Sequence, residues 1–506
     1  LDAMNQAWGS VVWSNIYTDF SQVPVPLPSG APANPGFALD YDRYQSFANV
    51  SFLEEQLSML RKLCPAHFVT TNNVGGVVDT IDMRDLYRNL DFVSADNYPG
   101  FFAMFLAADS GAALPPDALG SMIAFTHDFM RSAKDGKPFF IMEEQSGKAG
   151  QTIFSPQPEP GQLRLWSYQA VAHGAMGINY FRWDTPTFGA EEYWYGMLLH
   201  DRSHSAGFDE LVQTIRELKS LGPEALNARF DAAVALCFDP NSDWALTIQP
   251  GQPKLKYQSE ILPWYGSLAA SHAGVDIVNA TQDLSKYKVF CAPAMYVVSS
   301  EQADRIRSFV NGGGTFIAGI RLGVKDEHSR IVSTPLPGLL RDVMGVEVDF
   351  EPIYAEKQSV QFAGPLVGAD AECHIWADIL TPEKADVLAS YRSGSYAGKA
   401  AITSHSFGKG KAIYIGAHLE AADLGRVLLT LMALNGVTMA IQAPQGVEVT
   451  TRRAGQQSWI YFLNHTAKSQ LVNVTGSYQE ALSHAAVSGP ISLEPYGVRV
   501  LINHVM

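Results

Sequence analysis

Short apolar runs that end abruptly in polar residues recur through the first 185 positions of the chain, separated by stretches with helical character. The strand-like segments lie at 67–73, 91–99, 138–147 and 177–184, and the helix-like stretches at 121–134 and 160–173. Apolar strands that alternate with helices and carry polar and aromatic residues at their ends are typical of a (β/α)₈ barrel, whose active site lies at the carboxyl ends of its strands. The pattern therefore predicts an enzyme-like α/β architecture for the first part of the chain.

The segment 138–147 carries the most chemical information. Its apolar run ends in Glu143 and Glu144 and then enters a loop that contains Gly147. Neighbouring side chains on a strand point to opposite faces, so only one of these carboxylates can face an active-site mouth while the other packs sideways. The alternation alone does not say which one, and an ordinary strand end with two solvated glutamates is the competing interpretation.

The other strand ends supply groups that suit a sugar ligand. Segment 91–99 ends in Asp96, Asn97 and Tyr98, segment 177–184 ends in Phe181, Arg182 and Trp183, and segment 67–73 closes on Asn72. Aromatic faces stack on the CH surface of a sugar, while amides and carboxylates bind its hydroxyl groups. We therefore expect a carbohydrate site around one of the two glutamates.

A second alternation of strands and helices follows the amphipathic helix predicted at 209–221 and closed by Gly222 and Pro223. Strands are predicted at 232–238, 287–292 and 315–320, and helices at 256–272 and 301–310. This pattern indicates a doubly wound α/β domain that reaches to about residue 440. The glycine run 312–314 follows a helix and precedes a strand, the reverse of the order in a phosphate-binding loop. The alternating runs of residues 446–506 predict a small antiparallel β-domain.

Composition excludes several classes of protein. The chain has 506 residues, 47 % hydrophobic content and a formal charge of −15. This charge argues against a nucleic-acid partner, and no apolar stretch approaches the roughly 18 residues of a membrane span. Cys64, Cys237, Cys291 and Cys373 lie far apart and predict free buried thiols. The 13 histidines show no metal-binding spacing, so we expect neither a metal nor a cofactor.

Several motifs resemble glycoside hydrolase family 42, the β-galactosidases of a large clan of retaining enzymes built on (β/α)₈ barrels. The matching segments are Gln6–Ser14, Asn34–Gly36, Leu39–Arg43, Val93–Pro99, Met142–Gly147, Pro160–Ala175, Phe181–Trp183 and Gly189–Gly196. Their order and spacing are specific, and a weaker likeness extends to the C-terminus. The resemblance implies retaining hydrolysis of terminal β-D-galactose residues, from a β-galactoside or a galacto-oligosaccharide, through a covalent galactosyl-enzyme intermediate.

The resemblance also assigns roles to residues. In the family the glutamate directly after Met is the nucleophile, which implies that role for Glu143. Six residues are implied to bind the substrate: Asn72, Tyr98, Phe181, Trp183, Glu191 and Trp194. Trp194 stands where some relatives have His. Gln151 stands where relatives usually have a Trp eight residues after the nucleophile, so the alternatives are a missing stacking surface and its replacement by Phe154.

A second departure concerns the general acid/base. In the family this residue is the Glu of an Asn-Glu pair after the fourth strand, and the chain contains no such pair. We therefore expect residues 1–225 to form strands five to eight of the barrel, with the acid/base upstream of Leu1. The alternatives are a catalytically incompetent galactoside-binding fragment and an α-L-arabinopyranosidase.

The resemblance further implies how the rest of the chain is organised. Residues 228–440 would form a trimerisation domain similar to class I glutamine amidotransferases, although neither Cys237 nor Cys291 sits in the Gly-x-Cys-x-Gly turn of a nucleophilic cysteine. Residues 443–506 would form a small β-sandwich-like domain. A cytoplasmic homotrimer without nucleic-acid or membrane partners is the expectation.

Overall fold

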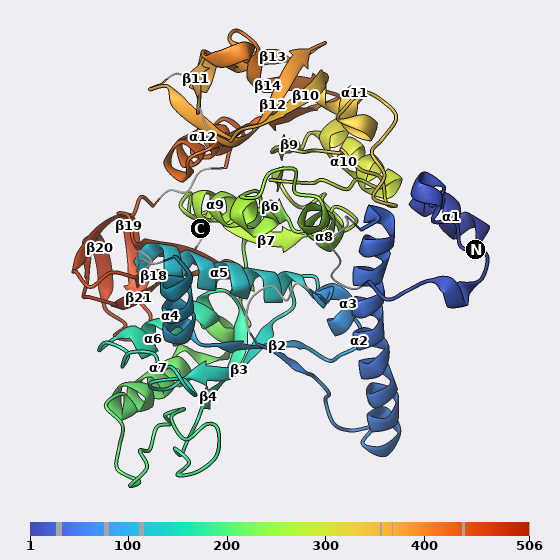
Figure 1. Cartoon of the computed structure of the whole chain (residues 1–506). Coiled ribbons are helices and arrows are strands. Elements are labelled where there is room, and N and C mark those ends of the chain that lie inside the picture. Colours follow the sequence, from blue (N-terminus) through green and yellow to red (C-terminus); the bar gives the residue numbers. More distant parts are fainter. Residues whose placement is uncertain are drawn as a thin grey trace.

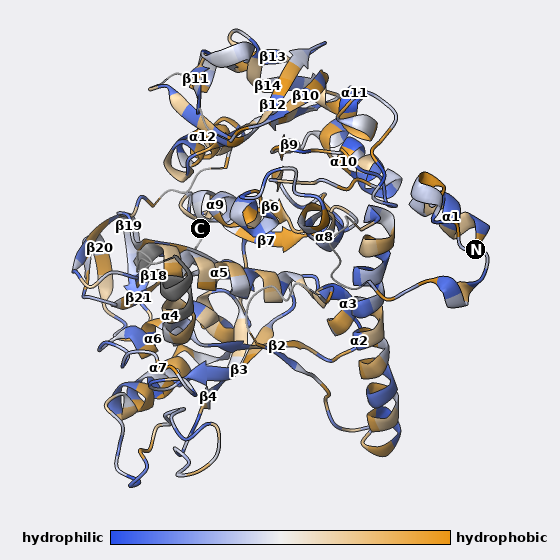
Figure 2. Ribbon diagram, in the orientation of Figure 1, coloured by the Kyte–Doolittle hydropathy of each residue, from blue (hydrophilic) through white to orange (hydrophobic). Residues whose placement is uncertain are grey.

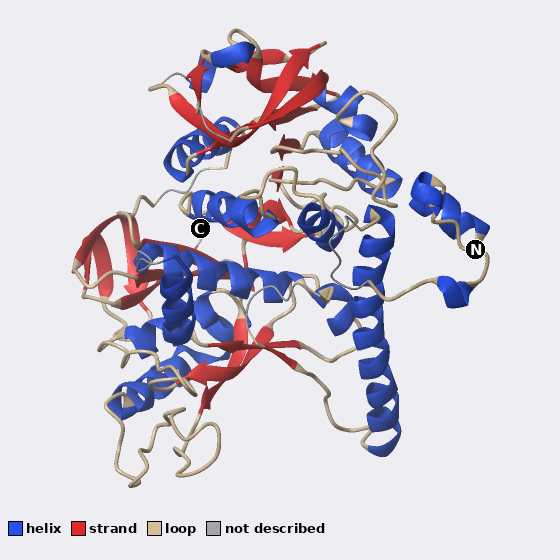
Figure 3. Ribbon diagram, in the orientation of Figure 1, coloured by secondary structure: helices blue, strands red, loops and turns tan. Residues whose placement is uncertain are grey.

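The computed structural model describes residues 1–26, 33–74, 80–110, 116–354, 357–366, 368–437 and 441–504. Its strands form three sheets: a parallel sheet of four strands, a larger sheet of eleven and an antiparallel sheet of six. Figures 1 and 3 show the four-stranded sheet low in the molecule, the six-stranded sheet at its left and the larger sheet above both. A parallel α/β part, an α/β domain and an antiparallel C-terminal sheet thus follow one another, as the sequence pattern predicted.

The first sheet is parallel and its strands lie in chain order. They are β1 (Asn72–Asn73), β2 (Val93–Asn97), β3 (Phe139–Gln145) and β4 (Ala175–Phe181). Helices α3 (Met83–Tyr87), α4 (Pro99–Ser110), α5 (Pro116–Ser132) and α6 (Gln162–Ala172) lie in the connections. Parallel neighbours need such crossovers, so the predicted alternation is present and all four carboxyl ends meet at one edge.

The strand predicted at 67–73 is shorter than expected. Only Asn72 and Asn73 pair with β2, and among the described residues β1 has no partner on its other side. The preceding backbone is held by Asp91 instead, whose carboxylate accepts a hydrogen bond from the Val69 N–H at 2.5 Å. A strand with one neighbour has half of the ladder bonds of an internal strand, which accounts for its early end.

The N-terminal segment consists of α1 (Asp2–Trp8), two 3₁₀ turns (Val12–Ser14 and Phe20–Gln22) and the long helix α2 (Pro35–Leu63). Asn34 caps α2, its side chain accepting a hydrogen bond from the Phe37 N–H. Several large apolar side chains of α2 are uncovered: Tyr44, Phe47, Phe52, Met59 and Leu63 are each at least 61 % exposed. Figure 2 shows hydrophobic and hydrophilic residues interspersed along this helix.

Helix α7 (Phe208–Asn227) consists of two helical segments, the first of which ends where predicted. The helical conformation breaks at Gly222, where φ is +78°, and one more turn follows. Glycine adopts this conformation without strain, and the fixed φ of Pro223 suits the first turn of a new helical segment. Gly222 and Pro223 therefore end the predicted helix and begin a short second segment.

The eleven-stranded sheet has a parallel half in the spatial order β7 (Gly274–Val278), β6 (Ala232–Cys237), β8 (Val289–Ala292), β9 (Thr315–Ala318) and β15 (Gly410–Ile415). The predicted strands β6, β8 and β9 are all present, and β7 appears as a hydrophobic strand in Figure 2. Helices α8 (Pro240–Ile248), α9 (Tyr257–Ala269), α10 (Ser300–Gly312), α11 (Arg341–Met344) and α12 (Ala421–Leu434) belong to this domain.

The other half of that sheet is antiparallel and was not predicted. It is formed by β10 (Val346–Pro352), β11 (Gln358–Phe362), β12 (Ala371–Pro382), β13 (Asp386–Tyr391) and β14 (Ala400–Phe407), with β16 (Ala417–Leu419) paired to β12. The domain is therefore a doubly wound core with an antiparallel extension. Its predicted end near residue 440 lies outside the described residues.

The C-terminal sheet has the order β20 (Ala486–Leu493), β19 (Gln470–Glu480), β21 (Val498–His504), β18 (Gln457–Asn464), β17 (Val447–Ala454) and β5 (Arg229–Phe230). Its pairings are antiparallel. Strand β5 comes from the segment that follows α7, so the last part of the chain is hydrogen-bonded to the link between the first two parts.

A buried cluster of charged side chains joins the three parts, and we call it the junction. Arg131 of α5 pairs with Asp128 of the same helix and, at 2.9 Å, with Asp276 of β7. Its guanidinium lies 3.7 Å from the centre of the Phe230 ring on β5. The Tyr265 hydroxyl of α9 donates to Asp128 at 2.7 Å. Arg131 thus contacts residues from all three parts of the chain: α5, β7 of the α/β domain and β5 of the C-terminal sheet.

His173 extends the junction to the C-terminal sheet. Its Nδ1 lies 2.6 Å from an oxygen of Asp128 and its Nε2 lies 2.6 Å from an oxygen of Glu448 on β17. His465 lies 2.9 Å from the other oxygen of Glu448. Burial alone would lower the pKa of His173, but the two carboxylates raise it to about 9. A protonated imidazole therefore bridges the first part of the chain to the last.

Two further expectations concern cysteines and membranes. Cys237, Cys291 and Cys373 are buried free thiols, as predicted, whereas Cys64 is only partly buried because it caps the end of α2. Burial raises the pKa of each of the three buried thiols. Across the described ranges, none of the helices combines the length and apolar character that crossing a membrane requires.

Candidate active site

The two glutamates at the end of β3 have different surroundings. Glu144 is fully buried, and both of its carboxylate oxygens accept hydrogen bonds from Nδ2 of Asn97, at 3.1 and 3.0 Å. Burial raises the pKa of Glu144 to about 8, against the opposing effect of the Asn97 hydrogen bond. Glu143 is only partly buried and lies on the other face of the strand. The strand therefore presents one carboxylate to the sheet edge and packs the other into the interior.

Tyr98 is the partner of Glu143. Its hydroxyl donates to Oε2 of Glu143 at 2.6 Å, a short bond typical of a hydroxyl on an ionised carboxylate. Burial, followed by this hydrogen bond, raises the pKa of Tyr98. The tyrosine lies just beyond the end of β2, the strand adjacent to β3. Neighbouring parallel strands thus bring Tyr98 and Glu143 together at one edge.

Tyr98 packs against two further aromatic rings. The Tyr98 ring is perpendicular to the Trp194 ring at 5.0 Å and to the Phe181 ring at 6.5 Å, and Phe181 lies 6.4 Å from Trp194. Phe181 ends β4, and Trp194 comes from the loop that follows it. Edge-to-face packing fixes the rings and leaves an apolar wall beside a carboxylate.

Asn72 and Asp96 form a second polar pair at the same edge. Nδ2 of Asn72 donates to both oxygens of Asp96, at 3.0 and 2.9 Å. Burial, with a contribution from the charge of Glu143, raises the pKa of Asp96 to about 7, although the Asn72 hydrogen bond opposes this shift. Asp96 pairs in register with Glu143 across β2 and β3. The sequence analysis noted Asp96 at a strand end but did not predict it as a site residue. The register of β2 and β3, which pairs Asp96 with Glu143, could not be read from the sequence.

Glu191 and Trp183 lie further out. Arg182 donates to Oε2 of Glu191 at 3.1 Å, and its guanidinium lies 4.9 Å from the centre of the Phe181 ring. Glu191 is therefore connected to the aromatic group through Arg182. Trp183 is 59 % exposed, and its ring lies 6.3 Å from that of Phe208. The structure thus places Trp183 beside the start of α7, outside the ring contacts of Tyr98, Phe181 and Trp194.

The loops after β3 and β4 are tied to each other. The Tyr195 N–H donates to the carbonyl of Lys148, and the Ser146 hydroxyl donates to the carbonyl of Phe181 at 2.7 Å. Phe154 is partly exposed and its ring lies 4.6 Å from that of Tyr193. An aromatic side chain is therefore present in the loop that carries Gln151, paired with a ring from the neighbouring loop.

The described side chains of His, Cys, Asp and Glu do not gather in groups of three or more that suit a metal ion. The chemistry that the site offers is that of a carboxylate in a hydrogen-bonded aromatic setting. This arrangement is suited to a nucleophile that reacts with a sugar ring.

Comparison with known proteins matches the chain to three consecutive family profiles. They are described as beta-galactosidase over residues 1–221, beta-galactosidase trimerisation domain over 232–438 and beta-galactosidase C-terminal domain over 446–503. The first of the three is the profile of glycoside hydrolase family 42.

Individual relatives agree with the profiles. Beta-galactosidase BgaP of Planococcus sp. (strain L4) is 32 % identical over 517 residues, which cover 99 % of this chain and 74 % of the relative. The crystal structure of a beta-galactosidase from Bacillus circulans sp. alkalophilus superposes with a TM-score of 0.92 at 30 % identity and covers 99 % of this chain and 74 % of that one. A beta-galactosidase from the haloarchaeon Halorubrum lacusprofundi gives a TM-score of 0.90 at 31 % identity, with the same coverage.

Proposed function

Because the chain belongs to the β-galactosidases of glycoside hydrolase family 42 and is therefore a glycoside hydrolase, we propose that it acts by the retaining mechanism with Glu143 as its nucleophile. The observation that carries the proposal is the contrast between the two glutamates of β3. Glu143 is partly exposed and hydrogen-bonded to Tyr98, whereas Glu144 is fully buried and hydrogen-bonded to Asn97. Of the two, Glu143 is therefore the glutamate that we propose to meet the substrate.

In the proposed reaction, an oxygen of Glu143 attacks the anomeric carbon of a terminal β-D-galactose residue. The bond between this carbon and the aglycone oxygen breaks, and the oxygen takes a proton from a general acid. Water then attacks the galactosyl ester and loses a proton to the same residue, now acting as a base. Galactose leaves with its configuration retained and Glu143 returns to its ionised form.

The second carboxyl group is proposed to lie outside the 506 residues. Retaining enzymes hold their two carboxyl groups about 5–5.5 Å apart. Of the other carboxylates near Glu143, Glu144 is buried on the opposite face and both oxygens of Asp96 accept hydrogen bonds from Asn72. The four parallel strands are proposed to be half of a (β/α)₈ barrel, and the compared relatives are longer than this chain.

The galactose residue is proposed to rest on the aromatic wall of Tyr98, Phe181 and Trp194, with Asn72, Trp183 and Glu191 completing the site. Tyr98 links these rings to Glu143, because its hydroxyl donates to the Glu143 carboxylate, and aromatic faces suit the CH face of a sugar. No specific observation favours an arabinopyranoside or a purely binding role.

The assembly is proposed to be a homotrimer formed through the α/β domain. The support is the match of residues 232–438 to a profile described as a trimerisation domain. Sedimentation of the protein at micromolar concentration is expected to show a trimer, and a monomer alone would contradict this proposal.

Covalent labelling tests the nucleophile. A galactoside with fluorine at C2 slows the second step, so the intermediate accumulates and can be located by mass spectrometry of peptides. Label on the peptide at Glu143, absent in Glu143→Gln and present in Glu144→Gln, is the expected result. Label at Glu144, or retaining turnover without label at Glu143, would refute the assignment.

The proposed absence of the second carboxyl group is tested by comparing substrates whose leaving groups differ in their need for protonation. The 506-residue chain alone is expected to hydrolyse lactose slowly, because general acid catalysis contributes about 10²–10⁴-fold. A dinitrophenyl galactoside needs little protonation and should retain more of its rate. Full activity of the 506 residues on lactose would place the acid within them, with Asp96→Asn as the variant to examine next.

A further inference from the structure

The face of the four-stranded sheet that carries Glu143 also carries the pair formed by Asn72 and Asp96. Asn72 of β1 lies in register with Ser94 of β2, two residues before Asp96. Residues two apart on a strand share a face, and so do residues paired in register, so Asn72, Asp96 and Glu143 all point to one side of the sheet. The pair therefore lies on the same face as the proposed nucleophile, on the two strands that precede it.

The two members of the pair differ in exposure. Asp96 is only 6 % exposed, whereas Asn72 is exposed. Nδ2 of Asn72 donates to both oxygens of Asp96, at 3.0 and 2.9 Å. Asp96 is therefore the buried partner, and Asn72 is the partner that a ligand can reach.

The hydrogen bond between them determines how the amide of Asn72 is turned. An ionised carboxylate only accepts hydrogen bonds, and an amide has an NH₂ group that only donates and an oxygen that only accepts. Burial, with the charge of Glu143, raises the pKa of Asp96 to about 7 against the effect of the Asn72 hydrogen bond, so the carboxylate is ionised at about pH 8. The NH₂ group must then face Asp96, and Oδ1 of Asn72, which accepts no hydrogen bond from a described residue, is left for a ligand.

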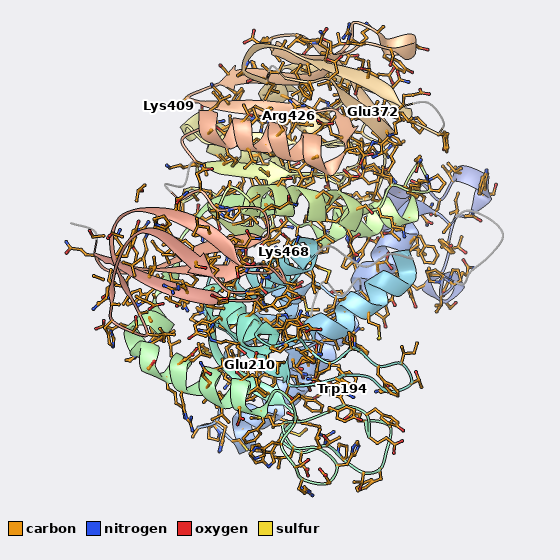
Figure 4. All side chains as sticks on the ribbon, turned by 90° about the vertical axis from the view of Figure 1, so that its left-hand side faces the viewer. Trp194, Glu210, Glu372, Lys409, Arg426 and Lys468 are labelled. Carbon is orange, nitrogen blue, oxygen red and sulfur yellow. The ribbon has the colours of Figure 1, made fainter. Side chains whose placement is uncertain are left out.

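Strand spacing sets which part of a substrate can meet Asn72. Neighbouring strands are about 4.8 Å apart, so β1 lies roughly 10 Å from β3. A sugar whose anomeric carbon is held at Glu143 has to reach across β2 to contact Asn72, and the group that does so is a hydroxyl group and not the reacting carbon. In Figure 4, Trp194 of the aromatic wall lies in the lower part of the molecule, below the α/β domain that carries Arg426.

We propose that Asp96 is a positioning residue, which holds Asn72 so that Oδ1 accepts a hydrogen bond from one hydroxyl group of the galactose residue. Asp96 itself does not touch the sugar. The inference rests on the proposed function, in which Asn72 helps to complete the substrate site. It makes that contact selective, because the site then requires a substituent that donates a hydrogen bond and disfavours one that only accepts.

Fluorinated sugars test the proposal on the whole chain, by titration calorimetry at about pH 8. D-Galactose is compared with analogues that carry fluorine in place of each hydroxyl group in turn, except the one on the anomeric carbon. Fluorine does not donate a hydrogen bond, so wild type should bind the analogue altered at the Asn72 contact about three- to tenfold more weakly than galactose. This analogue is identified as the one whose penalty disappears in Asn72→Ala.

Two further variants test the role of Asp96. In Asp96→Leu the amide of Asn72 is free to turn its NH₂ group to the fluorine, so the penalty for the same analogue should fall below about twofold. The double variant Asn72→Asp with Asp96→Asn keeps the hydrogen bond between the two positions but directs a carboxylate to the sugar. A carboxylate can only accept, so the penalty of wild type should be retained.

Ser94→Ala is the matched control on the same face of β2. It removes a 2.8 Å hydrogen bond to the carbonyl of Thr71 but leaves the pair of Asn72 and Asp96 intact, so its penalties should equal those of wild type. A variant that merely loosens the contact between the two strands is thereby distinguished from one that frees the amide.

Several outcomes would overturn the inference alone. The full penalty in Asp96→Leu would do so, as would galactose binding in which none of the penalties depends on Asn72. Loss of the penalty in the double variant would show that Nδ2 and not Oδ1 meets the sugar, and this measurement remains decisive if Asp96→Leu does not fold. A wild type that binds no galactose would instead overturn the proposed function, and this inference with it.

Discussion

The edge of the four-stranded sheet and the junction use the same kinds of side chain in opposite ways. In the junction, Arg131 and His173 each meet two carboxylates, and all of these groups are buried except Glu448, whose side chain is 15 % exposed. At the sheet edge, Glu143 is partly exposed and its hydrogen-bond partner is the hydroxyl of Tyr98. A charged group whose partners are all internal holds parts of the chain together. A charged group that keeps one face open can react.

The largest expected effect comes from the open carboxylate. Glu143→Gln, made in a protein that includes the proposed general acid, should lower kcat/KM on galactosides by roughly 10³-fold or more, because the attacking group is lost. Unfolding should change little, since Glu143 is not enclosed.

Glu144→Gln is the matched control one position along the strand. It places a second amide against Asn97 and should lower the free energy of unfolding by about 1–3 kcal/mol while much of the activity is kept. Thermal unfolding and initial rates on the two variants give the comparison. Equal loss of activity in both would remove the distinction between the two faces of β3.

The next effect should come from the junction. Arg131→Met leaves Asp128 and Asp276 buried without their common partner, and removal of one member of a buried pair typically costs about 3–5 kcal/mol. Urea unfolding measures the loss. Arg305→Ala, which removes an exposed pair with Glu301 on α10, should cost less than about 1 kcal/mol. A small effect of Arg131→Met would mean that the junction contributes little to stability.

Stability should also depend on pH through His173. Its pKa is raised to about 9, so its contribution is complete below the unfolded value near 6.5 and is lost as pH rises through 9, about 3 kcal/mol in all. Glu448 is shifted the other way: its pKa is lowered by His173 and His465 against the effect of burial, so its contribution is lost as pH falls below about 4.5. The pKa of Glu144 is raised to about 8, so the protein also loses stability as pH rises from the unfolded value near 4.5 through 8 and this buried carboxyl ionises.

The His173 share of this pH dependence can be isolated. The difference in unfolding free energy between wild type and His173→Gln, followed from pH 6 to pH 10, should shrink as pH rises. A constant difference would show that His173 does not titrate with the junction.

The smallest effect should come from Tyr98→Phe. This change removes one hydrogen bond to a carboxylate, worth about 1.5–3 kcal/mol, and should lower kcat/KM roughly ten- to hundredfold. Tyr193→Phe, in the partly exposed loop pair with Phe154, is the control and should retain nearly full activity. Equal rates in both variants would show that the Tyr98 hydroxyl does not support the reaction.

The sequence predicted those parts of the fold that depend on local pattern. Apolar runs that end in polar residues located β2, β3 and β4, and the period of the strand implied that Glu143 and Glu144 face opposite ways. The antiparallel strands between Val346 and Phe407 were missed, since their pairing depends on hairpin contacts within a domain interpreted only by its strand–helix alternation.

The junction was missed for a related reason. Asp128, Asp276 and Glu448 lie in different thirds of the chain, and nothing in the local sequence of any of them points to the others. Asp96 and Trp183 illustrate the same limit within the site. The register of β2 and β3 brings Asp96 beside Glu143, and the path of the loop after β4 brings Trp183 against Phe208. A sequence motif specifies neither the register nor the path of the loop.

The pairing of β5 with β17 has a consequence for the order of events during synthesis. Arg131 and His173 leave the ribosome long before Glu448 is synthesised. Strand β5, which carries Phe230, cannot pair until β17 has been synthesised. Domains usually fold one after another from the N-terminus as they emerge. Here His173 has its first carboxylate partner, Asp128, early, whereas its second partner, Glu448, is made only with β17. A ribosome stalled before residue 447 would therefore hold a chain in which β5 is not yet paired with β17 and His173 lacks Glu448.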